Sequence, residues 1–240
     1  MSSLPRLKEK WFSTKLYSDG RDVKFRPFTI GEQKQLMLVK ETAERPVDTY
    51  EAIVDMVGNC VKDIDIKTLY IIDLQKIFYD IRSIADGNEI KFSMKCENAE
   101  CGHTNDFILD TKKDFKLIGK TFTAQYDVGN NIKVSFRQPT VNAMLTVEKR
   151  QFESDTEKAL FTFATCLYQV DNAGQVLNYG QDFDVTDAVE FLDQFDSTVL
   201  KSLTTFTSDA PKINVIKEFV CIKCEHKKLF SPGEVDSFLS

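Results

Sequence analysis

The sequence predicts an α+β fold built from two similar halves, and three observations support this prediction. Stretches with alternating apolar residues, typical of strands, are interspersed with stretches whose apolar residues recur every three or four positions, typical of helices. Residues 23–30 and 134–141 agree in kind at five of eight positions. Each half ends in a strand that leads into a pair of cysteines. The pattern of hairpin, helices, strand and cysteine pair therefore occurs twice along the chain.

The first predicted elements are a β-hairpin over residues 13–28 and a helix that follows it. The two strands of the hairpin flank Gly20, which gives the turn the backbone freedom that it needs. Thr29 and Glu32 have the spacing of a capping box, in which each side chain binds the backbone N–H of the other residue. We therefore expect a helix that starts at Thr29 and extends to about Thr42.

Two further helices and a second pair of strands complete the first predicted half. Pro46 precedes a helix whose apolar residues follow the i, i+3, i+4, i+7 rule, and another helix is predicted over about 67–84. Apolar residues alternate over 90–94, as in a half-buried strand, and lead into Cys96. The return strand is predicted over 106–109.

The second half repeats this order after a charged connector. A hairpin is predicted over 121–139 with its turn at Gly129, and Thr140 begins a helix that extends to about Lys149. The remaining predicted elements are helices over 155–169, 185–195 and 197–207, a polar loop over 171–184, and strands over 215–220 and 228–230.

The repeat suggests a division of the chain into residues 1–110 and 111–240, each half ending in one cysteine pair. In this interpretation an ancient duplication produced the two halves, and the cysteine pairs meet at a pseudo-two-fold axis. The alternative is two independent subdomains with unrelated cysteine pairs. Cys60 and Cys166 lie in the corresponding second helices and are interpreted as small buried apolar side chains.

The four paired cysteines are the candidate metal ligands. Cys96 and Cys101 are separated by four residues, and Cys221 and Cys224 by two, both spacings that zinc knuckles use. Four thiolates fill the tetrahedral coordination of Zn²⁺ and leave no position for water or substrate. The binding energy of such a site becomes folding energy, so the predicted zinc ion is structural.

The spacing leaves two alternatives to four-cysteine ligation open. His103 and His226 stand two residues beyond the second cysteine of each pair, so one histidine could replace a cysteine as the fourth ligand. The thiols could also be free. A redox C-x-x-C motif is disfavoured because it needs a following helix, whereas strand residues follow Cys224.

The composition argues against several classes of function. A net charge of −6 disfavours nucleic acid as a main partner, because phosphate binding needs clustered lysine and arginine. No run of 18 apolar residues occurs, so a membrane is not the expected primary partner. The P-loop, G-x-S-x-G, H-E-x-x-H and dinucleotide-binding motifs do not occur either. We therefore expect neither an enzyme nor a small-molecule substrate.

Two arginines in equivalent positions are candidates for partner contacts. Arg26 and Arg137 each follow a strand phenylalanine and could anchor a carboxylate of another protein. The more ordinary role of an arginine at a strand end is an internal ion pair, and this alternative stays open for both residues.

Four motifs together resemble one phage family. They are a K-x-R-P-F strand at 24–28 that leads into an acidic capped helix, N-C-V-x-D at 59–63, D-L-x-x-I-F-x-x-I-R at 73–82, and the strand into the first cysteine pair. With these motifs the chain resembles the baseplate hub proteins of T4-like contractile-tailed bacteriophages. The resemblance is specific over residues 20–110 and extends to the remainder in outline.

The resemblance implies a late structural protein of the virion, located in the tail baseplate and present in the host cytoplasm during assembly. Its implied partners are other baseplate hub and tail proteins. Some hub-associated proteins act only as assembly chaperones and are absent from the finished particle, so this role is an alternative. A cellular zinc-ribbon adaptor, or an enzyme with an unrecognised site, is a further alternative from another functional class.

Overall fold

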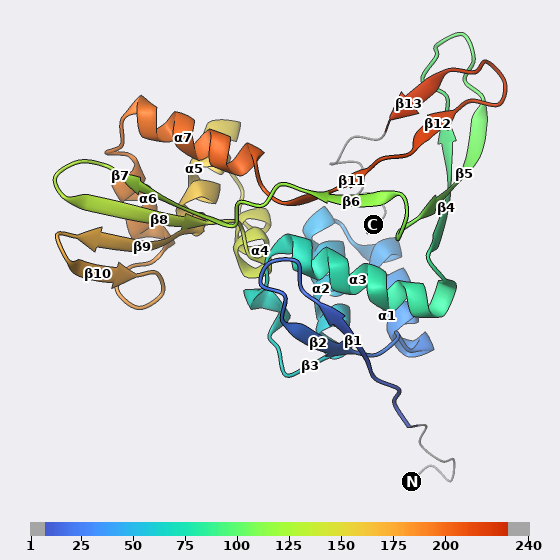
Figure 1. Cartoon of the computed structure of the whole chain (residues 1–240), viewed down its shortest axis with the longest axis horizontal. Helices are drawn as coiled ribbons and strands as arrows, with labels where there is room; N and C mark the ends of the chain where they lie inside the picture. The colour runs from blue at the N-terminus through green and yellow to red at the C-terminus, as the bar shows by residue number, and fades with distance from the viewer. Residues whose placement is uncertain (1–7, 230–240) are drawn as a thin grey trace. The chain divides into compact units, whose positions relative to one another are not determined.

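The chain folds into two compact units. The computed structural model describes residues 8–229. Within this range the structure is a mixed α+β fold with seven α-helices and several small antiparallel sheets (Figure 1), which confirms the predicted fold class. Unit 1 comprises residues up to Ile66, Asp73–Lys116 and residues from Ile213 onward, whereas unit 2 comprises Lys67–Ile72 and Leu117–Lys212. Both cysteine pairs therefore belong to unit 1. The predicted division at residues 110 and 111 stays a prediction.

Unit 1 combines a small sheet, three helices and two cysteine-bearing hairpins. The sheet has the order β1-β2-β3, while β4 pairs with β5 and β12 with β13. Its elements are β1 (Phe12–Lys15), β2 (Asp22–Phe25), α1 (Ile30–Thr42), α2 (Pro46–Asn59), β3 (Val61–Lys62), the 3₁₀ turn η1 (Ile66–Thr68), α3 (Ile71–Asp86), β4 (Glu89–Lys95), β5 (Thr104–Asp110), β12 (Glu218–Val220) and β13 (Lys227–Leu229). The unit boundary falls within η1 and α3, and also within β6 (Phe115–Ile118) and β11 (Lys212–Val215), which pair with each other.

Helix α3 holds the N-terminal hairpin in place through its acidic residues. The carboxylate of Asp73 is fully buried and accepts the backbone N–H groups of Tyr17 and Ser18 at 2.7 and 3.1 Å. Two turns further along α3, Asp80 accepts a hydrogen bond from the Thr14 hydroxyl at 2.5 Å. Asp80 also forms an ion pair with Lys76. Because these bonds satisfy polar groups of the turn after β1, the hairpin is fixed on the helix.

Unit 2 is a four-stranded antiparallel sheet whose apolar face is covered by helices. The strand order is β10-β9-β8-β7. Its elements are β7 (Thr123–Asp127), β8 (Ile132–Arg137), α4 (Val141–Lys149), α5 (Asp155–Cys166), β9 (Leu167–Asn172), β10 (Gln175–Asn178), α6 (Val185–Leu192) and α7 (Ser197–Ser208). Val134 and Phe136 of β8 are completely buried in a core that also contains Ala164 of α5, Ala188 of α6 and Leu203 of α7.

Tertiary pairing overrides the local pattern at several predicted boundaries. The helix predicted over 155–169 ends at Cys166, because Leu167 and Val170 pair with β8 as part of β9. The loop predicted over 171–184 contains β10, and the strand predicted over 215–220 is divided between β11 and β12. The helix predicted from residue 67 begins at Ile71, after the 3₁₀ turn. Strands β3 and β6 lie where no strand was predicted.

The start of α1 is stabilised by a network around Glu32. Thr29 caps the helix, and the predicted capping box is confirmed, with the Glu32 N–H 3.2 Å from the Thr29 hydroxyl and the Thr29 N–H 2.8 Å from the Glu32 carboxylate. Arg26 donates from its two Nη groups to both carboxylate oxygens, at 2.9 and 2.7 Å. The side chains of Arg26 and Glu32 are only 13% and 14% exposed. Each therefore depends on the other for its charge to be compensated.

We expect Glu32→Gln to lower the free energy of unfolding by about 1–3 kcal/mol at neutral pH. The hydrogen bond from Arg26 outweighs burial and lowers the pKa of Glu32 from 4.5 to about 2. Its contribution to stability is present above the unfolded pKa and is lost as the pH falls through the folded pKa. Urea unfolding of the wild-type and Glu32→Gln proteins, at neutral pH and near the folded pKa of Glu32 of about 2, measures this loss.

Glu41→Gln is the matched control, since Glu41 lies on the exposed side of the same helix. It should change the free energy of unfolding by no more than about 0.5 kcal/mol. An equal loss in both variants, or a Glu32→Gln effect that stays the same from neutral to strongly acidic pH, would contradict the role given to the Arg26–Glu32 pair.

Candidate metal centre

The two cysteine pairs lie in hairpin turns of the same local construction. Cys96 and Cys101 lie between β4 and β5, and Cys221 and Cys224 lie between β12 and β13. In each turn the N–H of the first cysteine donates to the carbonyl of the histidine after the second cysteine, at 2.8 and 2.9 Å. The residue directly after the second cysteine is left-handed in both turns, with φ of 56° at Gly102 and 58° at Glu225. This geometry turns both thiols of each hairpin to one side.

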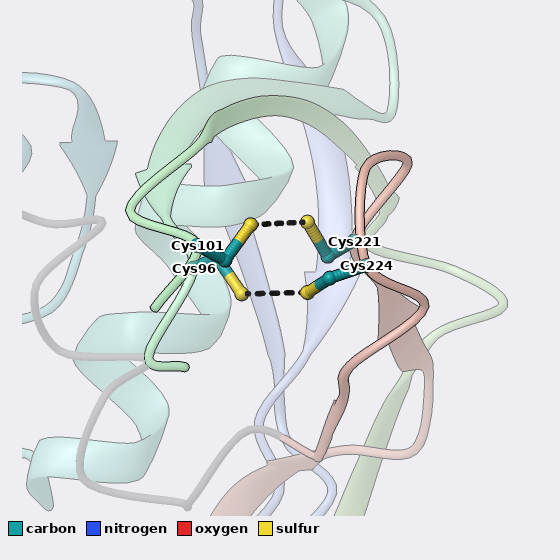
Figure 2. A group of neighbouring side chains, drawn as sticks. All are labelled: Cys96, Cys101, Cys221 and Cys224. Atoms are coloured by element: carbon teal, nitrogen blue, oxygen red, sulfur yellow. Dashed lines mark hydrogen bonds between the residues drawn. The ribbon is translucent and has the colours of Figure 1, made fainter. Parts of the chain in front are cut away.

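The four sulfur atoms converge on one point. Figure 2 shows the two thiols from the β4–β5 turn facing the two thiols from the β12–β13 turn. The Sγ atoms of Cys96 and Cys224 are 3.6 Å apart, those of Cys101 and Cys221 are 3.8 Å apart, and all four lie within 4.8 Å of one another. These separations are far longer than the roughly 2.05 Å bond of a disulfide, and all four cysteines are free.

The spacing of the sulfur atoms fits a tetrahedral metal ion. Four sulfurs that each lie about 2.3 Å from a Zn²⁺ ion are separated by about 3.8 Å. The separations of 3.6 and 3.8 Å are close to this value, and the others do not exceed 4.8 Å, so the cluster could hold a metal ion without large movement of the chain. Thiolates are soft ligands that suit Zn²⁺, Cu⁺ and iron–sulfur clusters, whereas Mg²⁺ and Ca²⁺ prefer oxygen.

The two histidines near the cluster contribute backbone carbonyl oxygens as hydrogen-bond acceptors. His103 and His226 accept the N–H groups of Cys96 and Cys221 through their carbonyl oxygens. Among the residues that the structure describes, the group of side chains close enough to share an ion contains four cysteines and no histidine. The geometry therefore favours four-sulfur ligation over the alternative with three cysteines and one histidine.

Comparison with known proteins places the chain in a family. Residues 9–240 match the family described as T4 bacteriophage base plate protein. The chain belongs to this family. Neither the curated proteins nor the solved structures gave a match. Membership confirms the resemblance at the level of phage baseplate proteins, which are generally structural rather than catalytic, and it implies contacts with other baseplate proteins.

In this baseplate protein a buried amide links the two cysteine turns. Asn105 of β5 is 2% exposed, and its Nδ2 group donates to the Sγ of Cys221 at 3.5 Å and to the carbonyl of His103 at 3.1 Å. Its Oδ1 accepts the N–H of Ile222 at 2.9 Å. The sequence analysis missed Asn105. The available signal was an amide at an alternating, inward position of β5, next to Phe107 and directly after a cysteine turn.

Hydrogen bonds and burial shift the pKa values of Cys221 and Cys96 in the baseplate protein in opposite directions. Burial opposes ionisation of Cys221, but the N–H groups of Lys223 and Cys224 and the amide of Asn105 lower the pKa of its thiol to about 6. At Cys96 burial dominates and raises the pKa to about 12. Negative charge is therefore favoured first at Cys221, and binding of a cation by all four sulfurs releases protons from the others.

Protein contacts also connect the two turns beside the sulfur cluster. Phe92 of β4, Phe107 of β5 and Phe219 of β12 form a ring cluster with centroid separations of 4.8–5.8 Å. Lys228 and Glu97 form an ion pair of 2.5 Å between the second and the first turn. The cysteines thus lie at one end of an apolar contact that already joins residues 218–229 to the β4–β5 hairpin.

The baseplate protein has no helix, among its described residues, that is long and apolar enough to cross a membrane.

Proposed function

We propose that this chain is a structural subunit of the baseplate hub of a contractile phage tail, where it acts through protein–protein contacts with other hub and tail proteins. The observation that carries the proposal is the closed four-sulfur cluster in a chain of the baseplate family. Four thiolates complete the coordination of an ion and leave no open position for substrate, so a metal bound there has a structural rather than a catalytic role.

The proposed ion is a structural zinc held by Cys96, Cys101, Cys221 and Cys224. Its support is the tetrahedral spacing of the sulfurs, together with a thiolate donor set that suits zinc. We expect about one zinc per chain by elemental analysis. Replacement by Co²⁺ should give the absorption bands of tetrahedral thiolate coordination, and a metal content near zero after purification in zinc-containing buffer would contradict the assignment.

The position of the chain in the virion is tested by the composition of purified particles. Mass spectrometry should find the chain in mature phage in a fixed ratio to other baseplate proteins. Absence from particles, combined with a requirement during assembly, would instead support a hub assembly chaperone. A cellular zinc-ribbon adaptor is not retained, because the chain belongs to a phage family.

We also propose that the two β-hairpin and helix-pair regions arose by duplication. In each, a hairpin is followed by a threonine-capped helix, a second helix and a strand that pairs antiparallel with the second hairpin strand: β1-β2-α1-α2-β3 and β7-β8-α4-α5-β9. Thr29 and Thr140 cap the corresponding helices, and the buried Cys60 and Cys166 lie at the ends of the second helices. This correspondence supports the duplication independently of the cysteine pairs.

A further inference from the structure

The same arginine motif occurs in both units, in the same local geometry. Arg26 lies three residues before the helix cap Thr29, and Arg137 lies three residues before the helix cap Thr140. In each helix the N–H of the third residue donates to the threonine hydroxyl at 3.2 Å. That third residue is Glu32 in unit 1 but Ala143 in unit 2. The two arginines therefore differ in the side chain available to them.

The guanidinium of Arg26 has its hydrogen-bond and ion-pair partners within unit 1. Its two Nη groups bind both oxygens of Glu32, and Nη2 also donates to the carbonyl of Asn59 at 2.9 Å. Its Nε lies 3.6 Å from the carboxylate of Glu9. The internal pairing considered as an alternative in the sequence analysis is therefore the role of Arg26.

Arg137 lacks such a partner. It is half-buried at the end of β8, and its Nε is buried without a hydrogen bond. Within residues 8–229 the structure gives its guanidinium no hydrogen bond and no ion pair, and its nearest ring contact is Tyr168, with 6.0 Å from the guanidinium carbon to the ring centroid. Ala143 cannot supply the carboxylate that Glu32 supplies to Arg26. Arg137 is thus left with a cation–π contact in place of an ion pair.

A second tyrosine interacts electrostatically with Arg137. Burial and Asp184 raise the pKa of Tyr179, and the positive charge of Arg137 acts in the opposite direction. Asp184 forms no ion pair with Arg137, and its Oδ1 accepts the N–H groups of Thr186 and Asp187. Among the described residues Arg137 therefore has an aromatic contact but no carboxylate partner, which a bound anion would supply.

We propose that Arg137, with Tyr168 beside it, is a carboxylate-binding site that receives an aspartate or glutamate of a neighbouring protein. Since Nε is covered, the carboxylate would bind the two Nη groups end-on, as Glu32 binds Arg26. The origin of this carboxylate in another baseplate protein rests on the proposed function. The binding site itself rests on the unit 2 residues alone.

The test uses the full-length protein labelled with ¹⁵N-arginine, with the Nε–Hε resonance of Arg137 assigned by its loss in Arg137→Gln. The probe is a short blocked peptide with one glutamate, compared with the same peptide carrying glutamine and with inorganic phosphate. We expect the glutamate peptide to shift the Arg137 resonance and to leave that of Arg26 unchanged. No shift at Arg137, an equal shift at Arg26, or preference for phosphate would overturn the proposal.

Three variants sharpen the experiment. Arg137→Gln should reduce affinity for the glutamate peptide about tenfold or more, because a charge-assisted bidentate contact is lost. Arg137→Lys should restore only part of it, since an ammonium cannot form the planar fork. Ala143→Glu should also weaken binding by placing an internal carboxylate where unit 1 has Glu32. If Ala143→Glu fails to fold because residue 143 is buried, the glutamine and lysine variants still decide the result.

Incorporation into phage particles separates this inference from the proposed function. If wild-type protein enters particles and Arg137→Gln does so poorly, the bound carboxylate belongs to a baseplate neighbour. If the wild-type chain is absent from particles while its peptide binding depends on Arg137, the virion role is wrong and the carboxylate site stands. Equal incorporation of both proteins would overturn the assignment of Arg137 to an interface in the particle.

Discussion

Replacement of Cys221 by serine, or removal of metal with a strong chelator, is expected to release residues 218–229 from the β4–β5 hairpin. Cys221 is the most buried of the four cysteines, and hydrogen bonds to its sulfur lower its pKa to about 6, which favours the thiolate that a metal binds. Structural zinc sites in small domains supply roughly 10 kcal/mol or more of apparent binding energy. The ring cluster of Phe92, Phe107 and Phe219 cannot replace this, because aromatic pairs add only about 0.5–1.5 kcal/mol each beyond burial.

Three measurements on the full-length protein detect this release. Elemental analysis should show that bound zinc falls from about one per chain toward zero. The melting temperature should fall, and hydrogen exchange should rise in residues 218–229 and 89–110 while the β7–β10 core of unit 2 keeps its protection. Trypsin should cleave faster at Lys223, Lys227 and Lys228, which lie within or shortly after the second cysteine turn.

Cys60→Ala is the matched control for the loss of a thiol. Cys60 is fully buried at the end of α2 and lies outside the sulfur cluster, so its removal should cost stability without changing the zinc content. If chelation removes the metal completely and leaves the melting temperature and the protection of residues 218–229 unchanged, the metal does not hold these segments together.

Much of the fold could be predicted from the sequence because its signals are local. The capping-box spacing at Thr29, the turn glycine at position 129 and the apolar periodicity of α2 each specify an element without reference to the rest of the chain. The four cysteines were also predictable as one group, since two knuckle spacings imply ligands for a shared ion. Their convergence within 4.8 Å agrees with this expectation.

What escaped prediction depends on contacts between distant segments. Residues 167–170 continue the apolar pattern of α5, and only pairing with β8 makes them a strand. The difference between Arg26 and Arg137 is local instead, because the third residue of the helix after each strand is Glu32 in one case and Ala143 in the other, and the sequence analysis did not use it. Asn105 was overlooked because an isolated asparagine in a strand carries no motif, and its role arises only where two cysteine turns meet.

The second large effect is expected at Asn105. Asn105→Ala should lower zinc affinity by about 10- to 100-fold, since partners that orient metal ligands typically contribute this much. It removes the hydrogen bonds from a buried amide to the Cys221 sulfur, the His103 carbonyl and the Ile222 N–H. The free energy of unfolding should also fall, by about 1–3 kcal/mol, because these buried hydrogen bonds are lost and the Ile222 N–H loses its acceptor.

Asn105→Asp distinguishes orientation of the sulfur from simple packing. The aspartate keeps the shape of the side chain and an oxygen for the Ile222 N–H, but it replaces the donor at the Cys221 sulfur with a negative oxygen. Because a carboxylate next to a thiolate repels it, zinc affinity should fall below that of Asn105→Ala, with wild type highest. Competition with a chromophoric chelator measures all three affinities.

Asn98→Ala provides the matched comparison, because Asn98 also donates to a ligand sulfur, that of Cys224, but at 3.9 Å rather than 3.5 Å. Asn98 is partly exposed, whereas Asn105 is buried, so water can more readily replace the hydrogen bonds of Asn98, and its loss should weaken zinc binding less than the loss of Asn105. Equal losses for the two alanine variants, or an Asn105→Asp protein that binds zinc as tightly as wild type, would show that the buried amide does not position the metal ligands. The predicted order instead makes one amide both a donor to the Cys221 sulfur, beside the N–H groups of Lys223 and Cys224, and the group that holds the second cysteine turn against the first.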